Sequence, residues 1–181
     1  MHIYMSRHGE SVNNTLNIIG GDCNITDKGK EYGKILGNYF NNTTLDVYTS
    51  KLKRTKETAA FITSNPIELS DLNEIHSGDF EGLLLDDIIT NFPDLYEIRN
   101  KDKLNNRYPN GENYNDLYNR VIVALDTISK NNTKILLIAH QAVCRVIYSY
   151  FTKTHLSECI DVKIDLHSLY ELKEQEFIQI L

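Results

Sequence analysis

The segment of residues 134–139, Lys-Ile-Leu-Leu-Ile-Ala, most constrains what this chain can fold into. After Lys134 every residue is apolar, so the segment has no polar face and is typical of a strand covered on both sides of a parallel sheet. Further strand-like segments lie at residues 2–6, 45–49 and 67–69, with helical patterns between them. Strands that alternate with helices predict an α/β fold, a three-layer sandwich around a mostly parallel central sheet.

Two of the helices have predicted starts. Thr26 is placed to cap a helix, and Asn113 is placed to cap another that covers residues 114–128. Further helices are expected at 51–64 and 141–151, and closing strands at 162–166, 169–172 and 177–181. The apolar face of the first helix is expected to contain Tyr32, Ile35, Leu36, Tyr39 and Phe40.

Residues 74–111 fit this alternation poorly. They contain one amphipathic stretch at 83–92 and then a polar segment with Arg99, Lys103 and Arg107. Open α/β sheets bind ligands beyond the carboxyl ends of their strands. We therefore expect a cap-like insertion around residues 75–112 over that edge of the sheet.

Composition and charge exclude several classes of protein. The chain has 181 residues, which suits one domain over residues 1–181, and its formal net charge is −6. Nucleic acids and anionic membranes bind basic surfaces, so neither is an expected partner. The three cysteines form no CxxC pair, and no apolar run reaches the roughly 18 residues of a membrane span. We expect a reduced, cytoplasmic protein.

Two histidines follow predicted strands closely. His8 lies after the strand at 2–6, and His140 comes directly after residues 134–139. Because neighbouring parallel strands end at one edge of a sheet, both imidazoles are expected there. A histidine that attacks phosphorus needs an adjacent cation for the phosphoryl oxygens, which Arg7 supplies, and a close-fitting loop, which Gly9 permits.

Less specific interpretations apply to single side chains. A lone histidine is more often a satisfied core or surface group, and Glu74 by itself would be a surface carboxylate. On spacing alone Arg54 would pair with a glutamate one helical turn later. The cations at 99, 103 and 107 could equally form one solvated helix face. The six histidines form no HxxxH or HxH pair, so neither a metal site nor a cofactor is predicted.

Longer motifs around these histidines resemble a known family. The chain is similar to the histidine phosphatase superfamily, whose fold is phosphoglycerate-mutase-like. The motifs are Arg7-His8-Gly9-Glu10-Ser11, residues 49–58, Leu72-Asn73-Glu74-Ile75 and His140. The resemblance covers most of the chain and implies a phosphohistidine intermediate formed at the carboxyl edge of the sheet.

A closer resemblance is to the bisphosphatase half of the 6-phosphofructo-2-kinase/fructose-2,6-bisphosphatase family. It is carried by residues 19–22, 99–103, 107–114 and 140–145. The sequence contains no GxxxxGK[ST] phosphate-binding loop, so no kinase domain is predicted.

The resemblance implies a role for each matched residue. His8 would attack the 2-phosphoryl group, with Arg7, Arg54 and His140 around it. Glu74 would be the general acid for the departing sugar oxygen. The implied substrate contacts are Asn14 at the phosphoryl group, the Ile19–Gly20 backbone at the sugar, and the more distant Arg99, Lys103, Arg107, Tyr114, Gln141 and Arg145.

Three features depart from the pattern of the bisphosphatases. His76 occupies a position at which the family commonly has Asp. Leu85 stands where the bisphosphatase relatives place a Tyr that contacts the 6-phosphate. Residues 78–82 resemble the generic phosphatase branch instead. The motifs therefore support the type of reaction more strongly than the substrate.

The expected function is a metal-independent phosphohydrolase that acts on a small anionic sugar phosphate, with fructose 2,6-bisphosphate as the leading substrate. A broader phosphatase, a mutase of the phosphoglycerate type and a non-catalytic binding module of the same fold are the alternatives. A mutase has to keep water from its phosphoenzyme, whereas the cationic segment at 99–107 favours a second phosphate on a sugar. A binding module has no need of a proton donor beside a nucleophile. The oligomeric state is not predicted.

Overall fold

The structure, a computed structural model, describes residues 2–130, 133–173 and 176–181. Its centre is a six-stranded sheet with the order β3-β2-β4-β1-β5-β6. The strands are β1 Ile3–Arg7, β2 Asp46–Thr49, β3 Ile67–Glu68, β4 Ile135–Ala139, β5 Leu169–Lys173 and β6 Glu176–Gln179. The first four pair in parallel, whereas β5 and β6 extend the sheet from β1 as antiparallel strands. The prediction of a mostly parallel sheet is confirmed.

Helices connect the strands. They are α1 Val12–Leu16, α2 Asp27–Tyr39, α3 Lys53–Ala59, α4 Leu85–Asn91, α5 Pro93–Lys101, α6 Tyr114–Ile128, α7 Gln141–Thr152 and α8 Leu156–Cys159. Two short 3₁₀ turns, η1 Ser70–Leu72 and η2 Gly78–Phe80, precede the cap. Within the described parts of the chain, none of the helices is long and apolar enough to cross a membrane.

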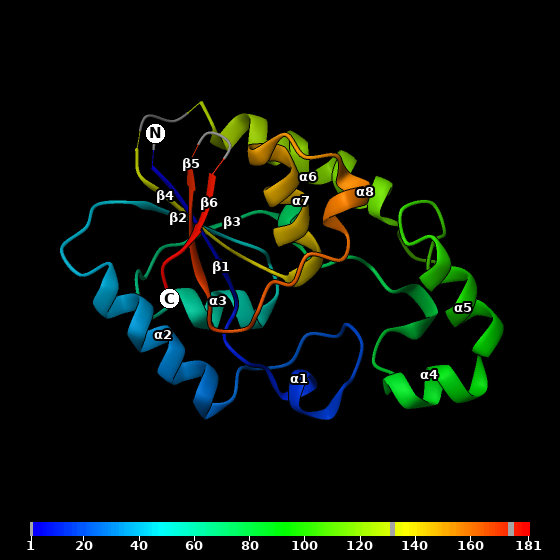
Figure 1. The fold of residues 1–181 in the computed structure, drawn as a ribbon. Helices are drawn as coiled ribbons and strands as arrows, with labels where there is room; N and C mark the ends of the chain where they lie inside the picture. The colour runs from blue at the N-terminus through cyan, green and yellow to red at the C-terminus, as the bar shows by residue number, and fades with distance from the viewer. Residues whose placement is uncertain (1, 131–132, 174–175) are drawn as a thin grey trace.

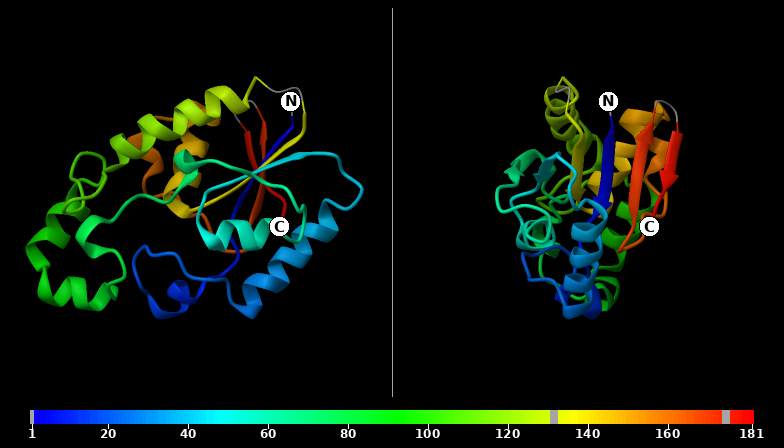
Figure 2. Two further views of the ribbon diagram at one scale, coloured as in Figure 1. Left: turned by 180° about the vertical axis from the view of Figure 1, so that it is seen from behind. Right: turned by 90° about the vertical axis from the view of Figure 1, so that its left-hand side faces the viewer.

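The side chains of β4 alternate between two cores. Ile135 and Leu137 contact the core that the sheet shares with α6 and α7, whereas Leu136 and Ile138 contact the core that it shares with α2 and α3. All four side chains are fully buried. Figure 1 shows α2 and α7 on opposite sides of the sheet, and Figure 2 shows the same arrangement from behind. The three-layer sandwich is confirmed, and it explains why the strand has no polar face.

The predicted starts of α2 and α6 are also confirmed. The Thr26 hydroxyl accepts a hydrogen bond of 3.1 Å from the N–H of Gly29. Asn113 and Asp116 form a capping box, in which each side chain accepts from the backbone N–H of the other residue. These contacts satisfy N–H groups that the first turn of a helix leaves without partners.

Three predicted elements differ from the structure. The helix expected at 51–64 is confined to Lys53–Ala59. The buried face of α2 is narrower than expected, because Ile35 and Tyr39 are 50% and 43% exposed. Residues 162–166 alternate apolar and polar side chains but form a loop, not a strand. The carbonyls of Val162 and Ile164 in that loop accept hydrogen bonds from arginine side chains, so no neighbouring strand is needed to satisfy them.

The cap lies where the sequence predicts it. α4 and α5 stand away from the sheet on the same side as α1 (Figure 1). Backbone hydrogen bonds of 2.9 Å, from Ile19 to Leu83 and from Leu85 to Asn17, tie the cap to the loop that follows β1. The polar segment after residue 92 forms the separate helix α5, which begins at Pro93 because a proline at the first helical position lacks only an N–H that would be unpaired.

Candidate active site

His8 and His140 meet at the carboxyl ends of two adjacent strands. β1 and β4 are parallel neighbours with Arg7 opposite Ala139. The two rings lie 5.1 Å apart between centroids, and the residues are 3% and 0% exposed. The expectation that the two post-strand histidines converge is confirmed by this geometry. A Cβ added at Gly9 would lie 2.6 Å from the carbonyl oxygen of Gly29, so the loop after His8 passes too close to α2 for a larger residue.

His8 presents an unprotonated ring nitrogen. Its Nδ1 lies 2.8 Å from the carbonyl oxygen of Gly9, and because a carbonyl only accepts, Nδ1 carries the proton. Nε2 accepts a hydrogen bond of 3.2 Å from Nε of Arg54. Burial, followed by the charge of Arg54, lowers the pKa of His8 well below its ordinary value. The side chain is therefore a neutral imidazole with a lone pair on Nε2, the form in which a histidine acts as a nucleophile.

His140 is oriented by two hydrogen bonds. Its Nδ1 accepts from Nε of Arg54 at 3.1 Å, so Nε2 carries the proton and donates to Oγ of Ser50 at 2.8 Å. Burial, followed by the charges of Arg54 and His8, lowers the pKa of His140 well below its ordinary value. Ser50 lies in the motif at residues 49–58, but the sequence alone assigns it no role. Its partner, His140, is 90 residues away in the chain.

Arg7 and Arg54 supply the positive charge beside His8. Nη1 of Arg54 donates to the carbonyl oxygen of Gly21 at 2.7 Å. The alternative i+3 pair of Arg54 with Glu57 is not formed, because that carboxylate accepts from the N–H of Ile25. Nη1 of Arg7 donates to a loop carbonyl at 2.9 Å, whereas its buried Nε has no partner among the described residues. A donor left in that state is available to an oxyanion.

Glu74 lies between two cavities and lines both of them. Its Oε1 accepts from the N–H of Ile75 at 2.9 Å, and its Oε2 lies 3.5 Å from the N–H of Ala142 in the first turn of α7. The first cavity, of about 470 Å³, also reaches Arg54. This arrangement leaves the carboxyl group facing space in which a leaving group or a water molecule fits.

The second cavity, of about 450 Å³, gathers most of the predicted substrate-binding residues. They are Ile19, Gly20, Arg99, Lys103, Tyr114, Gln141 and Arg145. Nη1 of Arg145 donates to the Tyr114 hydroxyl at 2.8 Å, and burial raises the pKa of that phenol to about 12. Lys103 forms an ion pair of 2.7 Å with the exposed Asp161. The cavity thus has its own cations, in addition to those beside His8.

Arg99 is the most unusual cation of this cavity. The residue is 5% exposed, and its Nε and Nη1 have no hydrogen-bond partner in the described part of the chain. Its guanidinium carbon lies 4.5 Å from the ring centroid of Tyr108 and 5.8 Å from that of Tyr114. Buried donors are normally satisfied. The two open donors therefore indicate an anionic ligand, and the alternative of a solvated helix face is wrong for Arg99.

Ile19 and Gly20 border the cavity through their backbone. Gly20 has φ 62°, and a Cβ there would lie 1.9 Å from a carboxylate oxygen of Glu81. That carboxylate accepts from the N–H of Gly21 and from both the N–H and the hydroxyl of Ser77. Glu81, which the sequence analysis did not single out, thereby joins the loop after β1 to the cap.

Two predicted substrate contacts are not brought to the cavities. Arg107 is 64% exposed in its side chain and forms a bidentate ion pair with Asp116 at 2.6 and 2.7 Å. Arg107 was predicted to contact substrate, but a carboxylate on α6 holds it outside the described linings of both cavities. Oδ1 of Asn14 accepts from the N–H and the hydroxyl of Ser11 at the start of α1. Asn14 is absent from the described linings of both cavities, so its contact with a phosphoryl group stays a prediction.

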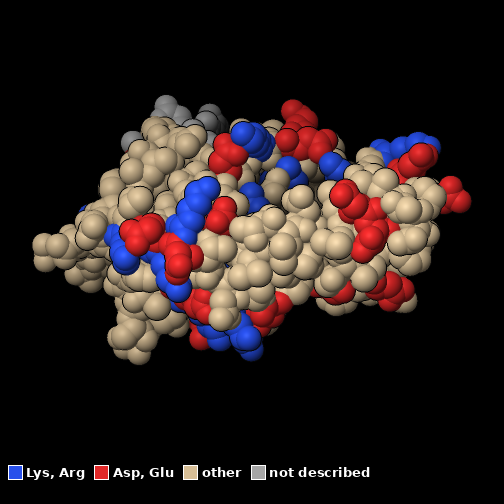
Figure 3. Space-filling model, turned by 90° about the horizontal axis from the view of Figure 1, so that it is seen from below, with Lys and Arg blue, Asp and Glu red and all other residues tan. Residues whose placement is uncertain are grey.

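On the face at which the parallel strands end, some of the positive charge lies in a hollow. Figure 3 views the molecule from the side at which the parallel strands end. Lys and Arg atoms lie inside a hollow near the centre of this face, and Asp and Glu atoms lie at its rim. Such a surface repels a polyanion but admits a small anion that fits the hollow.

The two buried histidines make folding sensitive to acid. Their pKa values are lowered in the folded state, so between those values and about 6.5 the unfolded chain binds more protons. We expect the free energy of unfolding to fall by about 1.4 kcal/mol per pH unit for each histidine as the pH decreases from about 6.5. Urea unfolding between about pH 7 and 5 measures this slope. His140→Asn should reduce this slope by the contribution of one histidine. An unchanged slope would show that His140 does not contribute to the pH dependence.

Comparison with known proteins identifies the family. The model of the histidine phosphatase superfamily (branch 1) matches residues 3–177. The chain belongs to this superfamily, in agreement with the fold and with the paired histidines at the end of the sheet.

Curated relatives are bisphosphatases. The chain is 36% identical over 177 residues to 6-phosphofructo-2-kinase/fructose-2,6-bisphosphatase of Arabidopsis thaliana, covering 94% of this chain and 24% of the relative. It is 33% identical over 180 residues to fructose-2,6-bisphosphatase of Saccharomyces cerevisiae, covering 97% of this chain and 40% of the relative. The chain thus spans well under half the length of these relatives.

Solved structures that are named as other phosphatases share the fold of this chain. A putative alpha-ribazole-5'-P phosphatase from Escherichia coli superposes with a TM-score of 0.88 at 21% identity, over 100% of this chain and 95% of that one. A mycobacterial glucosyl-3-phosphoglycerate phosphatase gives a TM-score of 0.83 at 18% identity, over 99% and 96% of the two chains. At this identity the likeness concerns the fold alone.

Proposed function

We propose that the protein hydrolyses the 2-phosphate of fructose 2,6-bisphosphate through a phosphohistidine at His8. The observation that carries the proposal is the presence of two separate cation groups on either side of Glu74. Arg7 and Arg54 adjoin the nucleophile, and the cavity around the unpartnered Arg99 lies beyond the carboxylate. Two phosphates on one small sugar require two such groups.

In the first step, Nε2 of His8 attacks the phosphorus atom. A bond forms between nitrogen and phosphorus while the bond from phosphorus to the sugar oxygen breaks. The carboxyl group of Glu74 gives its proton to the departing oxygen, which leaves as the sugar hydroxyl. Arg7 and Arg54 stabilise the negative charge on the transferring phosphoryl group, and His140 orients Arg54 by accepting a hydrogen bond from its Nε.

In the second step, water attacks the phosphohistidine. The Glu74 carboxylate, deprotonated by the first step, takes a proton from the water as its oxygen bonds to phosphorus. The bond from phosphorus to Nε2 breaks, and inorganic phosphate and neutral His8 are restored. Because Glu74 returns to its acid form, the cycle is complete without a further proton donor.

A broader phosphatase is the second candidate. Leu85 lines the second cavity with an apolar side chain, at a position where the bisphosphatase pattern has a hydroxyl group. The solved structures of similar fold carry the names of phosphatases for other substrates. The apolar side chain of Leu85 favours a less selective site.

A substrate panel tests the proposal. The pure protein, without added metal, is incubated with fructose 2,6-bisphosphate, fructose 6-phosphate, 3-phosphoglycerate and p-nitrophenyl phosphate, and phosphate release is followed for each. We expect kcat/KM for the bisphosphate to exceed the others by at least about 100-fold, since two buried charge contacts are made only there. Equal values across the panel would contradict the proposed substrate while retaining the phosphatase class.

Restoring a hydroxyl group at position 85 tests where the second phosphate lies. Leu85→Tyr is expected to lower KM for the bisphosphate about 2- to 10-fold, the effect of one added hydrogen bond, with kcat unchanged. Leu84→Tyr is the matched control, because Leu84 is the adjacent residue, is 42% exposed and is outside the described lining of the cavity. An equal KM in both variants would place the second phosphate elsewhere.

A further inference from the structure

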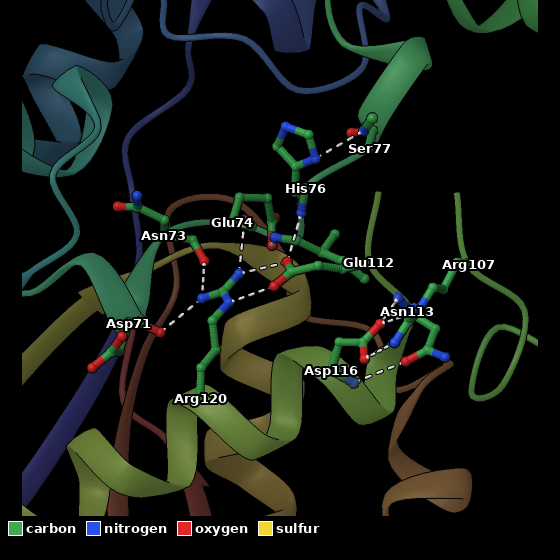
Figure 4. Close-up of polar contacts among 12 residues, drawn as sticks. Asp71, Asn73, Glu74, His76, Ser77, Arg107, Glu112, Asn113, Asp116 and Arg120 are labelled. Carbon is green, nitrogen blue, oxygen red and sulfur yellow. Dashed lines mark hydrogen bonds and ion pairs between the residues drawn. The ribbon is translucent and has the colours of Figure 1, made fainter. Parts of the chain in front are cut away.

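Arg120 on α6 uses all five of its N–H donors within the protein, on the backbone of residues 71–74 and on the carboxylate of Glu112. Nη1 donates to the carbonyl oxygens of Asp71 and Asn73, both at 2.8 Å, and Nη2 donates to that of Glu74 at 3.0 Å. Nε and Nη2 also donate to the two carboxylate oxygens of Glu112, each at 2.8 Å. Figure 4 shows the guanidinium between these groups.

Glu112 completes the contact from the other side. Its Oε2 accepts from the N–H of His76 at 2.8 Å, and its own N–H donates to the carbonyl oxygen of His76 at the same distance. Burial raises the pKa of Glu112, but the hydrogen bonds from Arg120 and His76 outweigh it, so the pKa is lowered and the carboxylate stays charged. The bond to Arg120 is partly buried, with both side chains 22% exposed.

The segment held in this way carries the proposed general acid. Residues 73–77 belong to no helix or strand, so their backbone groups have no ladder of regular hydrogen bonds. The Arg120–Glu112 pair instead fixes the carbonyls at 71, 73 and 74 and both polar groups of residue 76. The position of the Glu74 backbone, and with it the aim of its carboxyl group between the two cavities, depends on these bonds.

We propose that Arg120 and Glu112 are positioning residues that hold Glu74 in place to protonate the leaving group, an inference that rests on the proposed function. Arg120 has no donor left for a phosphate, since its five N–H groups are all used within the protein. It therefore acts through the backbone of Glu74. Both residues line the 470 Å³ cavity that Glu74 and Arg54 also line.

The test compares two leaving groups in the first turnover. One substrate is the sugar phosphate that the panel ranks best, whose alcohol needs a proton to leave. The other is p-nitrophenyl phosphate, whose phenolate leaves without one. Rapid-quench measurement of the first release of leaving group isolates phosphorylation of His8 from the later hydrolysis step. Glu74→Gln serves as the reference, because it shows how far the first release slows when the acid itself is removed.

We expect Arg120→Met to slow the first release from the sugar phosphate by about 10- to 100-fold, as misplacement of a catalytic group does. Release from p-nitrophenyl phosphate should change by less than about threefold. Glu112→Gln, a milder variant, should show a smaller loss with the same selectivity. The first release from p-nitrophenyl phosphate (the burst) also reports whether His8 and its arginines are intact. A variant that fails to fold would lose this burst as well.

Asp116→Asn is the matched control, because it is the same acid-to-amide change in the neighbouring carboxylate–arginine pair of α6 (Figure 4). Asp116 makes no described contact with residues 71–76, and the control should leave both bursts unchanged. Equal losses on the two substrates in Arg120→Met, or no loss on the sugar phosphate, would overturn the inference. Failure of the proposed function has a different appearance: the wild-type protein then gives no burst with either compound, and the inference falls with it.

Discussion

His8→Ala is expected to reduce turnover of any phosphate substrate by about 10⁴- to 10⁶-fold, the usual loss when a covalent nucleophile is removed. Nε2 of His8 carries a lone pair beside Arg54, and burial keeps it unprotonated. Hydrogen bonds to Ser50 and from Arg54 hold both ring nitrogens of His140. Steady-state phosphate release at neutral pH measures the effect.

The control for this variant is His2→Ala. His2 is an exposed histidine at the opposite end of β1, where it contacts Glu171. It should keep full activity, and both variants should unfold cooperatively, so that a loss at position 8 reports chemistry and not folding. Retention of more than about one hundredth of the activity in His8→Ala would contradict the nucleophile assignment.

Arg99→Met is expected to raise KM for fructose 2,6-bisphosphate by about 10- to 150-fold, which corresponds to the roughly 1.5–3 kcal/mol of a hydrogen bond to a charged group. The guanidinium already lies buried against Tyr108 with two open donors, so little rearrangement is needed when a phosphate binds. Met preserves the apolar part of that packing. Turnover of p-nitrophenyl phosphate, which has no second phosphate, should change by less than about threefold.

Lys101→Met is the control for the loss of one positive charge. Lys101 lies on the same helix, α5, but its side chain is 76% exposed and pairs with Glu97. Its removal should leave KM within about twofold. If Lys101→Met and Arg99→Met raise KM equally, general attraction of the substrate explains the effect and the cavity around Arg99 is not the second phosphate site.

Local patterns in the sequence are sufficient to predict the sheet and the paired histidines. The apolar run of β4 has one physical solution, a strand covered on both sides, and a residue that directly follows such a strand must emerge at the edge of the sheet. Residues 162–166 show the limit of the same reasoning. Their alternation is real, but partly buried arginine side chains satisfy the loop carbonyls, and no local pattern reveals such a partner.

The cations show the same limit within the site. Arg99 and Arg107 have similar polar surroundings in the sequence, yet one is buried with open donors and the other is held outside by Asp116. Arg120 was not predicted at all, because three of its five hydrogen bonds go to backbone carbonyls, which every residue type has. Its place beside the apolar stripe of α6 is the one local signal that it is partly buried.

The charge of the site is more mixed than the sequence suggested. The cavity beside Arg54 is lined by Asp22, Glu74, Glu81 and Glu112 as well as by arginines. Glu81 and Glu112 are engaged by hydrogen bonds within the protein, so they act mainly as anchors for the backbone. Carboxylates at the rim and arginines in the interior favour a small ligand whose phosphates reach inward.

The central claim is tested most directly by locating the phosphoryl group during turnover. Fructose 2,6-bisphosphate with radioactive phosphorus at position 2 is mixed with the protein and quenched within the first turnover. The proposed mechanism predicts an acid-labile label on the peptide that contains His8, formed together with fructose 6-phosphate and lost at the rate of phosphate release. Release of labelled phosphate without any labelled protein, or a label on another residue, would contradict it.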